Sequence, residues 1–270
     1  MFREDEGRAQ AGECRLVGRR GWVRRGGWRG SLKQEVGTER HVEASAAVGG
    51  YGGIRNSGKS FSSYHAGWMK VALLDYGRGN LRSVERALAK AGAEVVHAET
   101  AHHLPGADCL VVPGQGSFGD AIRGLQERKL WDPLRDLVYS GKPYLGICLG
   151  FQILWEASEE APGVKGLNLI PGEVKRFHQS GLKVPLIGWC EVRPTARAKE
   201  LFAGGDRYFY HVHSYRPESA PTDWLACETE YGGWFPSGVG RGKVAAFQFH
   251  PEKSQDSGID LLRMVLAKLA

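Results

Sequence analysis

Residues 69–270 are predicted to form an α/β domain with an open, mostly parallel, mixed sheet flanked by helices. Short apolar runs alternate with helix-like segments in the first half of this stretch, which is typical of a parallel sheet covered on both faces. Residues 172–247 instead hold many short strand-like pieces without good helices between them, which favours an antiparallel portion. The amphipathic pattern of residues 259–269 predicts a final helix.

The individual elements follow from apolar runs and helix-capping residues. Residues 71–75 form a short apolar run that predicts a strand buried on both faces. Asn80 is a good N-cap for the next helix, in which apolar residues recur at helical spacing until Gly92 ends it. A helix is expected after residue 147, through 151–155. Further strands are expected at 94–97, 109–112, 144–147, 173–177, 187–192, 208–212 and 244–249.

Residues 1–68 differ from the domain in composition and charge. They hold 12 Lys or Arg and 7 Asp or Glu, a net charge of +5, and so most of the +6 of the chain. Gly/Arg clusters dominate and apolar residues are sparse, so we expect a disordered extension that cannot bury enough apolar surface to fold. The favoured account is that translation begins at Met69. Weak RNA binding by the Arg/Gly residues and their interleaved Trp is the alternative.

Residues 53–60, within this extension, match the phosphate-loop pattern GxxxxGK[ST]. Such a loop binds nucleotide phosphates only when a buried strand precedes it and a helix follows it. The flanking sequences, SAAVGGYG before and FSSYHAG after, predict neither element. Nucleotide binding is therefore not expected.

The totals of the chain exclude several classes of protein. No run of 18 apolar residues occurs, so no membrane-spanning helix is expected, and the N-terminus lacks the apolar segment of a signal peptide. The five cysteines have no CxxC spacing and indicate free thiols in a reducing, cytoplasmic compartment, with one of them reactive. Without residues 1–68 the net charge is +1, which argues against a nucleic-acid-binding domain.

Cys148 is the candidate nucleophile. It lies in Gly146-Ile-Cys-Leu-Gly150, where a buried strand is expected to turn sharply into a helix, as in a nucleophile elbow with Cys in place of Ser. The flanking glycines are expected to let the backbone bend tightly and to expose the sulfur. The alternative is a small buried cysteine without chemistry, which is the commoner role of a single Cys.

A thiolate that attacks a carbonyl carbon also needs a base and an oxyanion hole. His250 ends the strand-like run 244–249, and Glu252 can orient its ring through the second nitrogen, which completes a triad. Pro113-Gly-Gln-Gly116 follows a predicted strand and can bring backbone N–H groups close to a developing oxyanion. The backbone N–H of Leu149, directly after the nucleophile, is the second expected donor.

These motifs resemble those of the class I (triad) glutamine amidotransferases, whose signature is a GxCxG elbow with a distant His-Pro-Glu. Within that class, residues 69–270 resemble the glutaminase subunits of imidazole glycerol phosphate synthases, enzymes of histidine biosynthesis. The motifs that carry the resemblance are DYGRGNLRSV (75–84), PGQGSFG (113–119), GICLGFQ (146–152), EEAPG (159–163), HSY (213–215) and QFHPEKS (248–254). The first and last of these motifs select this subunit, whereas the elbow and His-Pro-Glu define only the class and imply its α/β fold.

The resemblance implies a mechanism without a cofactor or a metal. Cys148 would attack the side-chain amide of glutamine, His250 would pass a proton to the departing ammonia, and Glu252 would orient His250. Water would hydrolyse the glutamyl thioester, while ammonia travels to a cyclase subunit, the expected heterodimer partner. The cyclase would make imidazole glycerol phosphate and an aminoimidazole carboxamide ribotide. The implied substrate-binding groups are the side chains of Gln152, Glu160 and Ser214 and the backbone of Gly114, Gly116, Leu149 and Tyr215.

Three residues depart from the motifs of the resembled family. Gln115 stands where Val is usual in the oxyanion loop, Cys190 replaces the Asn of Gly-Trp-Asn, and His211 replaces a Phe. His211 and His213 lie on one face of a strand, but no further clustered ligand supports a metal site. Two other functions stay open. One is the glutaminase subunit of an anthranilate, nucleotide or pyridoxal synthase; the other is a non-enzymatic binding module that works through residues 1–68.

Overall fold

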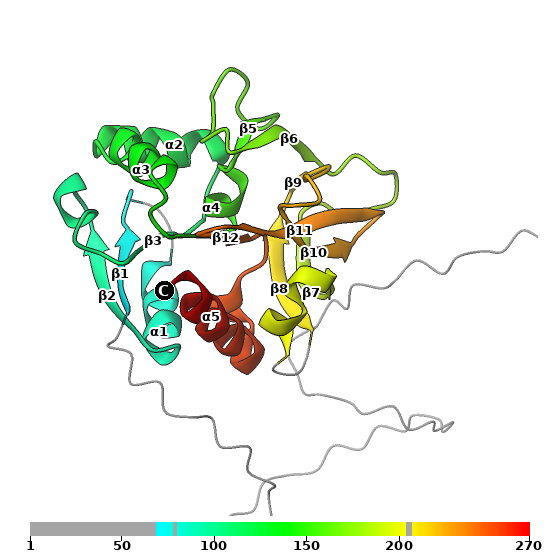
Figure 1. Ribbon diagram of the computed structural model, residues 1–270. Coiled ribbons are helices and arrows are strands. Elements are labelled where there is room, and N and C mark those ends of the chain that lie inside the picture. Colours follow the sequence, from blue (N-terminus) through cyan, green and yellow to red (C-terminus); the bar gives the residue numbers. More distant parts are fainter. Residues whose placement is uncertain (1–68, 78–79, 204–206) are drawn as a thin grey trace, which may run out of the picture. The chain divides into compact units, whose positions relative to one another are not determined.

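A computed structural model describes residues 69–77, 80–203 and 207–270 of the chain (Figure 1). The expectations for residues 1–68, including the disordered extension and the phosphate-loop pattern, lie outside the described residues. A nine-stranded sheet forms the centre of the described part. Its strands have the order β2 (Ala93–Ala98), β1 (Met69–Leu74), β3 (Cys109–Val112), β4 (Tyr144–Ile147), β12 (Val244–Phe247), β11 (Trp234–Arg241), β10 (Leu225–Glu230), β7 (Leu186–Pro194) and β8 (Tyr208–His213).

The sheet is parallel in one half and antiparallel in the other. Strands β2, β1, β3, β4 and β12 pair in parallel, and the pairings from β12 through β11, β10 and β7 to β8 are antiparallel. The prediction of a mixed α/β sheet is confirmed, and so is the antiparallel portion expected within residues 172–247. The parallel half has four strand pairs and so does the antiparallel half, so the parallel share is smaller than predicted.

Helices cover both faces of the parallel half, as Figure 1 shows. In β1, Val71 and Leu73 join the core that contains α1 (Leu81–Lys90) and α5 (Gln255–Leu269). Ala72 and Leu74 join the opposite core, which contains α2 (Phe118–Glu127) and α3 (Trp131–Tyr139). Successive side chains of a strand point to opposite faces, so a run that is apolar throughout suits a sheet that is buried on both sides.

A second, three-stranded sheet was not predicted from the sequence. It consists of β5 (Trp155–Ser158), β6 (Ile170–Arg176) and β9 (Tyr215–Pro217). Three 3₁₀-helices complete the described elements, namely η1 (Ala101–His103), η2 (Ala196–Phe202) and η3 (Pro251–Lys253).

Two expectations about helix ends have different outcomes. The Asn80 side chain accepts a hydrogen bond from the Ser83 backbone N–H at 3.4 Å, which confirms the predicted N-cap of α1. The helix expected through 151–155 is wrong in extent, because α4 (Leu149–Gln152) is a single turn and Trp155 begins β5. A short segment that is apolar on every side does not distinguish helix from strand, and here pairing of Trp155 with Ile170 decides for a strand.

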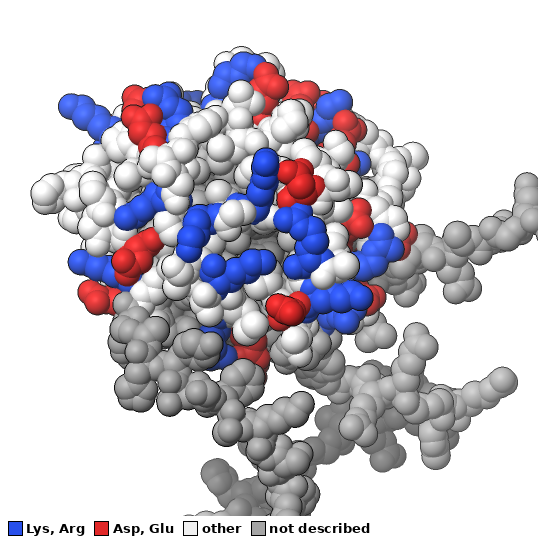
Figure 2. Space-filling view, in the orientation of Figure 1, with Lys and Arg blue, Asp and Glu red and all other residues white. Residues whose placement is uncertain are grey.

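The cysteines and the surface charges can be compared with the totals of the sequence. Cys109, Cys148 and Cys227 are free thiols, as expected. Figure 2 shows basic side chains gathered near the middle of one face, with acidic and further basic side chains around them. None of the described helices is long and apolar enough to cross a membrane.

Candidate active site

Three neighbouring parallel strands end at the same edge of the sheet, and a predicted site residue follows each of them. Cys148 directly follows β4, Gly114 lies two residues after β3, and His250 lies three residues after β12. The register pairs Ile147 with Phe247, so the segments that leave β4 and β12 start side by side. In open α/β sheets, ligands bind at the carboxyl ends of the strands, and this edge is therefore where a site is expected.

The backbone turns sharply at Cys148 itself. Its φ of 53° and ψ of −98° place a non-glycine residue in a strained region, as in a nucleophile elbow. Its N–H donates to the Phe247 carbonyl at 2.8 Å, and its side chain is 6% exposed. The flanking glycines permit this tight turn, as expected. A Cβ on Gly146 would lie 2.4 Å from the Gly150 oxygen across the turn, and a Cβ on Gly150 would lie 2.1 Å from the Val112 oxygen.

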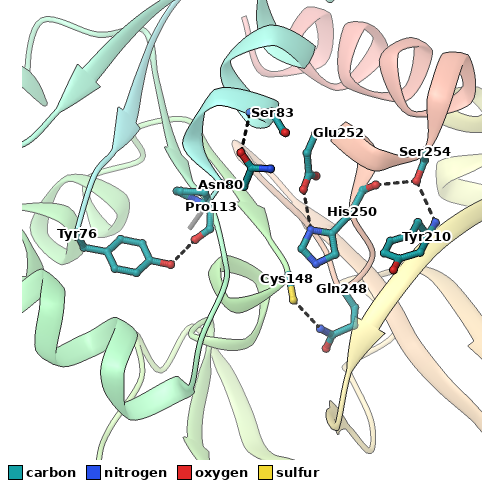
Figure 3. A network of polar contacts seen from close by, with 10 residues as sticks. All are labelled: Tyr76, Asn80, Ser83, Pro113, Cys148, Tyr210, Gln248, His250, Glu252 and Ser254. Carbon is teal, nitrogen blue, oxygen red and sulfur yellow. Dashed lines mark hydrogen bonds and ion pairs between the residues drawn. The ribbon is translucent and has the colours of Figure 1, made fainter. Parts of the chain in front are cut away.

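His250 and Glu252 form a buried pair beside the cysteine (Figure 3). His250 Nδ1 lies 2.7 Å from Glu252 Oε1, and both side chains are almost fully buried. Burial alone would lower the pKa of His250, but the charge and hydrogen bond of Cys148, together with Glu252, raise it to about 10. Glu252 occupies Nδ1, so Nε2 is the ring nitrogen that is left to exchange a proton with the sulfur.

The predicted oxyanion loop lies against the elbow. The Tyr76 hydroxyl donates to the Pro113 carbonyl at 2.7 Å and holds the start of the loop. Gly114 is so close to the elbow that a Cβ there would lie 2.1 Å from the Leu149 nitrogen. Leu149 is the first residue of α4, so its N–H has no acceptor within the helix. The loop backbone and the Leu149 N–H therefore meet next to the cysteine.

A pocket of about 350 Å³ opens at this edge of the sheet. It brings together Cys148, His250 and all seven predicted substrate-binding residues, while Glu252 contacts His250. The complete lining is Gly114, Gln115, Gly116, Cys148, Leu149, Gln152, Glu160, Pro185, Val212, His213, Ser214, Tyr215, His250 and Lys253. The spacing of these residues along the chain shows that the pocket is assembled from six segments far apart in the sequence.

Two polar side chains in the pocket wall are held by the backbone. Glu160 Oε2 accepts from the Phe118 N–H at 2.7 Å, and burial raises the pKa of Glu160 against this hydrogen bond. Gln152 Nε2 donates to the Tyr215 carbonyl at 3.0 Å. Both side chains keep an oxygen as an acceptor for a positively charged group of a ligand.

The two histidines of β8 are neutral and buried. His213 Nδ1 lies 2.9 Å from the Tyr215 carbonyl and His211 Nδ1 lies 3.0 Å from His213 Nε2. Burial lowers the pKa of His213 to about 3 and that of His211 well below its usual value. In the described part of the chain, no group of three or more His, Cys, Asp or Glu could hold a metal ion.

Two residues at the site had no role assigned from the sequence. Gln248 is fully buried, and its Nε2 lies 3.7 Å from the Cys148 sulfur. It precedes His250 by two residues, so an extended segment there places both side chains on one side, which is a signal that the sequence already contained. Tyr76 lies within the DYGRGNLRSV motif, but its contact with Pro113 joins residues 37 apart and has no local signal.

Comparison with known proteins agrees with this geometry. Residues 72–268 match the family glutamine amidotransferase class-I. The chain is 43% identical over 193 residues to imidazole glycerol phosphate synthase subunit HisH of Methanothermobacter thermautotrophicus, covering 72% of this chain and 96% of that protein. The chain belongs to the HisH family of class I glutamine amidotransferases.

Two further relatives and one solved structure are also similar to this HisH-family chain. Subunit HisH of Aquifex aeolicus is 43% identical over 197 residues, which are 72% of this chain and 94% of that protein. The imidazole glycerol phosphate synthase hisHF of Arabidopsis thaliana, a chloroplastic protein, is 42% identical over 199 residues, covering 73% of this chain but 34% of that longer protein. A solved glutamine amidotransferase shares the fold, with a TM-score of 0.57 at 23% identity, covering 73% of this chain and 98% of that one.

Proposed function

We propose that this chain is the glutaminase subunit of an imidazole glycerol phosphate synthase, which hydrolyses glutamine to glutamate and ammonia for histidine biosynthesis. The observation that carries the proposal is the Cys148–His250–Glu252 arrangement at the pocket, in a chain of the HisH family. A cysteine on a strained turn, a histidine beside it and a carboxylate behind the histidine are the parts that acyl transfer needs.

In the proposed mechanism, the Cys148 sulfur attacks the side-chain amide carbon of glutamine and forms a tetrahedral oxyanion. The Leu149 N–H and the Gly114–Gly116 backbone stabilise that oxyanion. His250, whose pKa is raised to about 10 by the neighbouring Cys148 and Glu252, gives its Nε2 proton to the departing nitrogen. Ammonia leaves and a glutamyl thioester remains. His250 then takes a proton from a water molecule, which attacks the thioester carbonyl and yields glutamate and the free thiol.

The charges of the pocket wall indicate how glutamine is held. We propose that the Glu160 carboxylate and the Gln152 side-chain oxygen accept hydrogen bonds from the α-ammonium group. Ser214 and the backbone near Tyr215 also line the pocket and are proposed to hold the α-carboxylate. This division uses acceptors for the cationic group and donors for the anionic one.

We propose that the partner is a cyclase subunit, with which the chain forms a heterodimer that takes up the ammonia. Support comes from the names of the relatives, which are subunits, and from hisHF, two thirds of which lie outside the part that this chain matches. We place the complex in the cytoplasm.

The proposal is tested by measuring glutamate release from glutamine by the full chain, with and without the cyclase and its nucleotide ligand. We expect little release by the chain alone and a large increase with the liganded cyclase, because binding energy in the complex can complete the oxyanion hole. Cys148→Ala should release no glutamate in either condition. If no glutamate is released with this cyclase, the pathway assignment is wrong, and the other synthases are the partners to test next.

We also propose that residues 69–270 are the glutamine amidotransferase domain and that residues 1–68 are an extension outside it. The family match begins at residue 72, which supports this boundary. A chain that starts at Met69 should keep its unfolding free energy and its cyclase-dependent activity. Aggregation or loss of activity on removal of residues 1–68 would contradict the boundary.

A further inference from the structure

Gln248 is a fully buried polar side chain that directly follows β12. Its backbone N–H donates to the Ser237 carbonyl at 2.9 Å, so the main chain is fixed at this position. A buried amide needs partners for both of its ends, because each unsatisfied polar atom costs free energy. The side-chain partners of Gln248 are Gln152 and Cys148, two of the proposed site residues.

Both ends of the Gln248 amide contact the proposed machinery, and Figure 3 shows the end that faces Cys148. Its Oε1 accepts from Gln152 Nε2 at 3.1 Å, and its Nε2 donates to the Cys148 sulfur at 3.7 Å. Gln152 and Cys148 both line the pocket. Gln248 therefore joins a residue that would touch the substrate to the sulfur that would attack it.

A backbone carbonyl determines the direction of these hydrogen bonds. The Tyr215 carbonyl can only accept, so the atom of Gln152 that faces it at 3.0 Å must be the amino nitrogen. The second hydrogen of that nitrogen points to Gln248, so the Gln248 atom that accepts it must be the side-chain oxygen, Oε1. The Gln248 amino group is then left to face the sulfur.

We propose that Gln248 is a positioning residue that holds the Cys148 sulfur as a hydrogen-bond acceptor and couples it to Gln152 in the glutamine pocket. This inference rests on the proposed role of Cys148 as the nucleophile. A buried N–H donor is stronger toward an ionised sulfur than toward a neutral one, so Gln248 favours the reactive form and fixes its orientation. His250 acts on the proton, whereas Gln248 acts on the position of the sulfur.

The first test replaces the amide by an apolar side chain of similar length, Gln248→Met. The rate of Cys148 alkylation by iodoacetamide at neutral pH should fall about tenfold, as expected for loss of one hydrogen bond to a charged group. The pH profile of alkylation should shift toward higher pH. The kcat with the liganded cyclase should fall by a factor similar to that of the alkylation rate. Alkylation needs no glutamine turnover, so it reports on Gln248 even if the proposed function is wrong.

Thr229→Val is the matched control for burial. Thr229 is fully buried and its hydroxyl donates to Ser237 at 2.8 Å, away from the Cys148 sulfur. This variant loses one buried hydrogen bond, and its alkylation rate should stay within twofold of the unmodified chain. A folded Gln248→Met that alkylates and turns over as Thr229→Val does would overturn the proposal, since Gln248 would then be only a core residue.

Gln248→Glu keeps the test decisive if Gln248→Met does not fold. Its carboxyl group can donate to the sulfur only while it is protonated, and its ionised form repels a thiolate. Alkylation of the unmodified chain should rise with pH, whereas that of Gln248→Glu should rise less or decline as the new carboxyl ionises. Identical profiles for the two proteins would refute the contact with the sulfur.

Discussion

Gly114→Ala is the substitution with the largest effect expected from the geometry of the oxyanion loop. A Cβ at this position would lie 2.1 Å from the Leu149 nitrogen and 2.4 Å from the Ile147 oxygen. Real Cβ contacts essentially never fall below 3.0 Å. The loop must therefore move away from the elbow by about 1 Å, because both neighbouring atoms belong to the backbone and cannot turn aside.

This displacement should affect catalysis more than stability. Loss of one oxyanion-hole donor lowers kcat by about 100-fold to 1,000-fold, and a misplacement of about 1 Å has an effect of similar size. Overpacking of a close-packed contact costs about 1–3 kcal/mol of unfolding free energy. We expect Gly114→Ala to stay folded and to lose at least 100-fold in cyclase-dependent glutamate release.

The assay compares glutamate release, ammonia-dependent cyclisation and urea unfolding of Gly114→Ala with those of Gly106→Ala. A Cβ on Gly106 would meet nothing within 4 Å, so this control adds the same methyl group without a clash. Ammonia-dependent cyclisation should persist in both variants, because it bypasses the glutaminase site. Normal glutamate release by a folded Gly114→Ala would refute the reasoning, since the loop could then not be the oxyanion hole.

Other substitutions test the triad and the pocket. Cys148→Ala should abolish glutamate release and leave ammonia-dependent cyclisation intact; loss of both activities would contradict the division of labour. Glu252→Gln keeps an acceptor for His250 but removes the charge, so kcat should fall about 100-fold, and an unchanged kcat would argue against the triad. Glu160→Gln should raise the KM for glutamine about tenfold with little change in kcat, which steady-state kinetics measures. Because folding raises the pKa of His250 from 6.5 to about 10, the protonated ring stabilises the folded state. This contribution is fully present below pH 6.5 and is lost as the pH rises through about 10. Urea unfolding of Cys148→Ala should show a smaller decline over that range, because the cysteine charge that raises the pKa is gone.

The sequence predicted the elements that are bounded by local signals. The strands at Cys109–Val112 and Tyr144–Ile147 have the predicted bounds, since short apolar runs flanked by turn residues define them. The helix expected at 151–155 ends at Gln152, and the strand expected at 244–249 ends at Phe247. Both were predicted too long, because contacts with residues far away in the sequence end them. Trp155 is fully buried and pairs with Ile170, which no local pattern contains.

The candidate site was predictable in its members but not in its hydrogen bonds. Motifs identified Cys148, His250 and Glu252 because a nucleophile, a base and a carboxylate are recognisable residue types. The contacts of Gln248 with Gln152 and Cys148 span 96 and 100 residues, and only the folded sheet brings these side chains together. Its place two residues before His250 in an extended segment indicates the side on which it lies but not its partners.

The register between β4 and β12 is what makes these contacts possible. Pairing Ile147 with Phe247 brings Cys148 beside the start of the segment that carries Gln248 and His250, and the Cys148 N–H donates to the Phe247 carbonyl at 2.8 Å. A slip of one residue would turn alternate side chains to the opposite face and would separate the sulfur from both. Apolar residues on both faces of β4 are buried in two different cores, so such a slip would also expose or misplace packed side chains. The packing that stabilises the sheet therefore also fixes the distance between the proposed nucleophile and the proposed base.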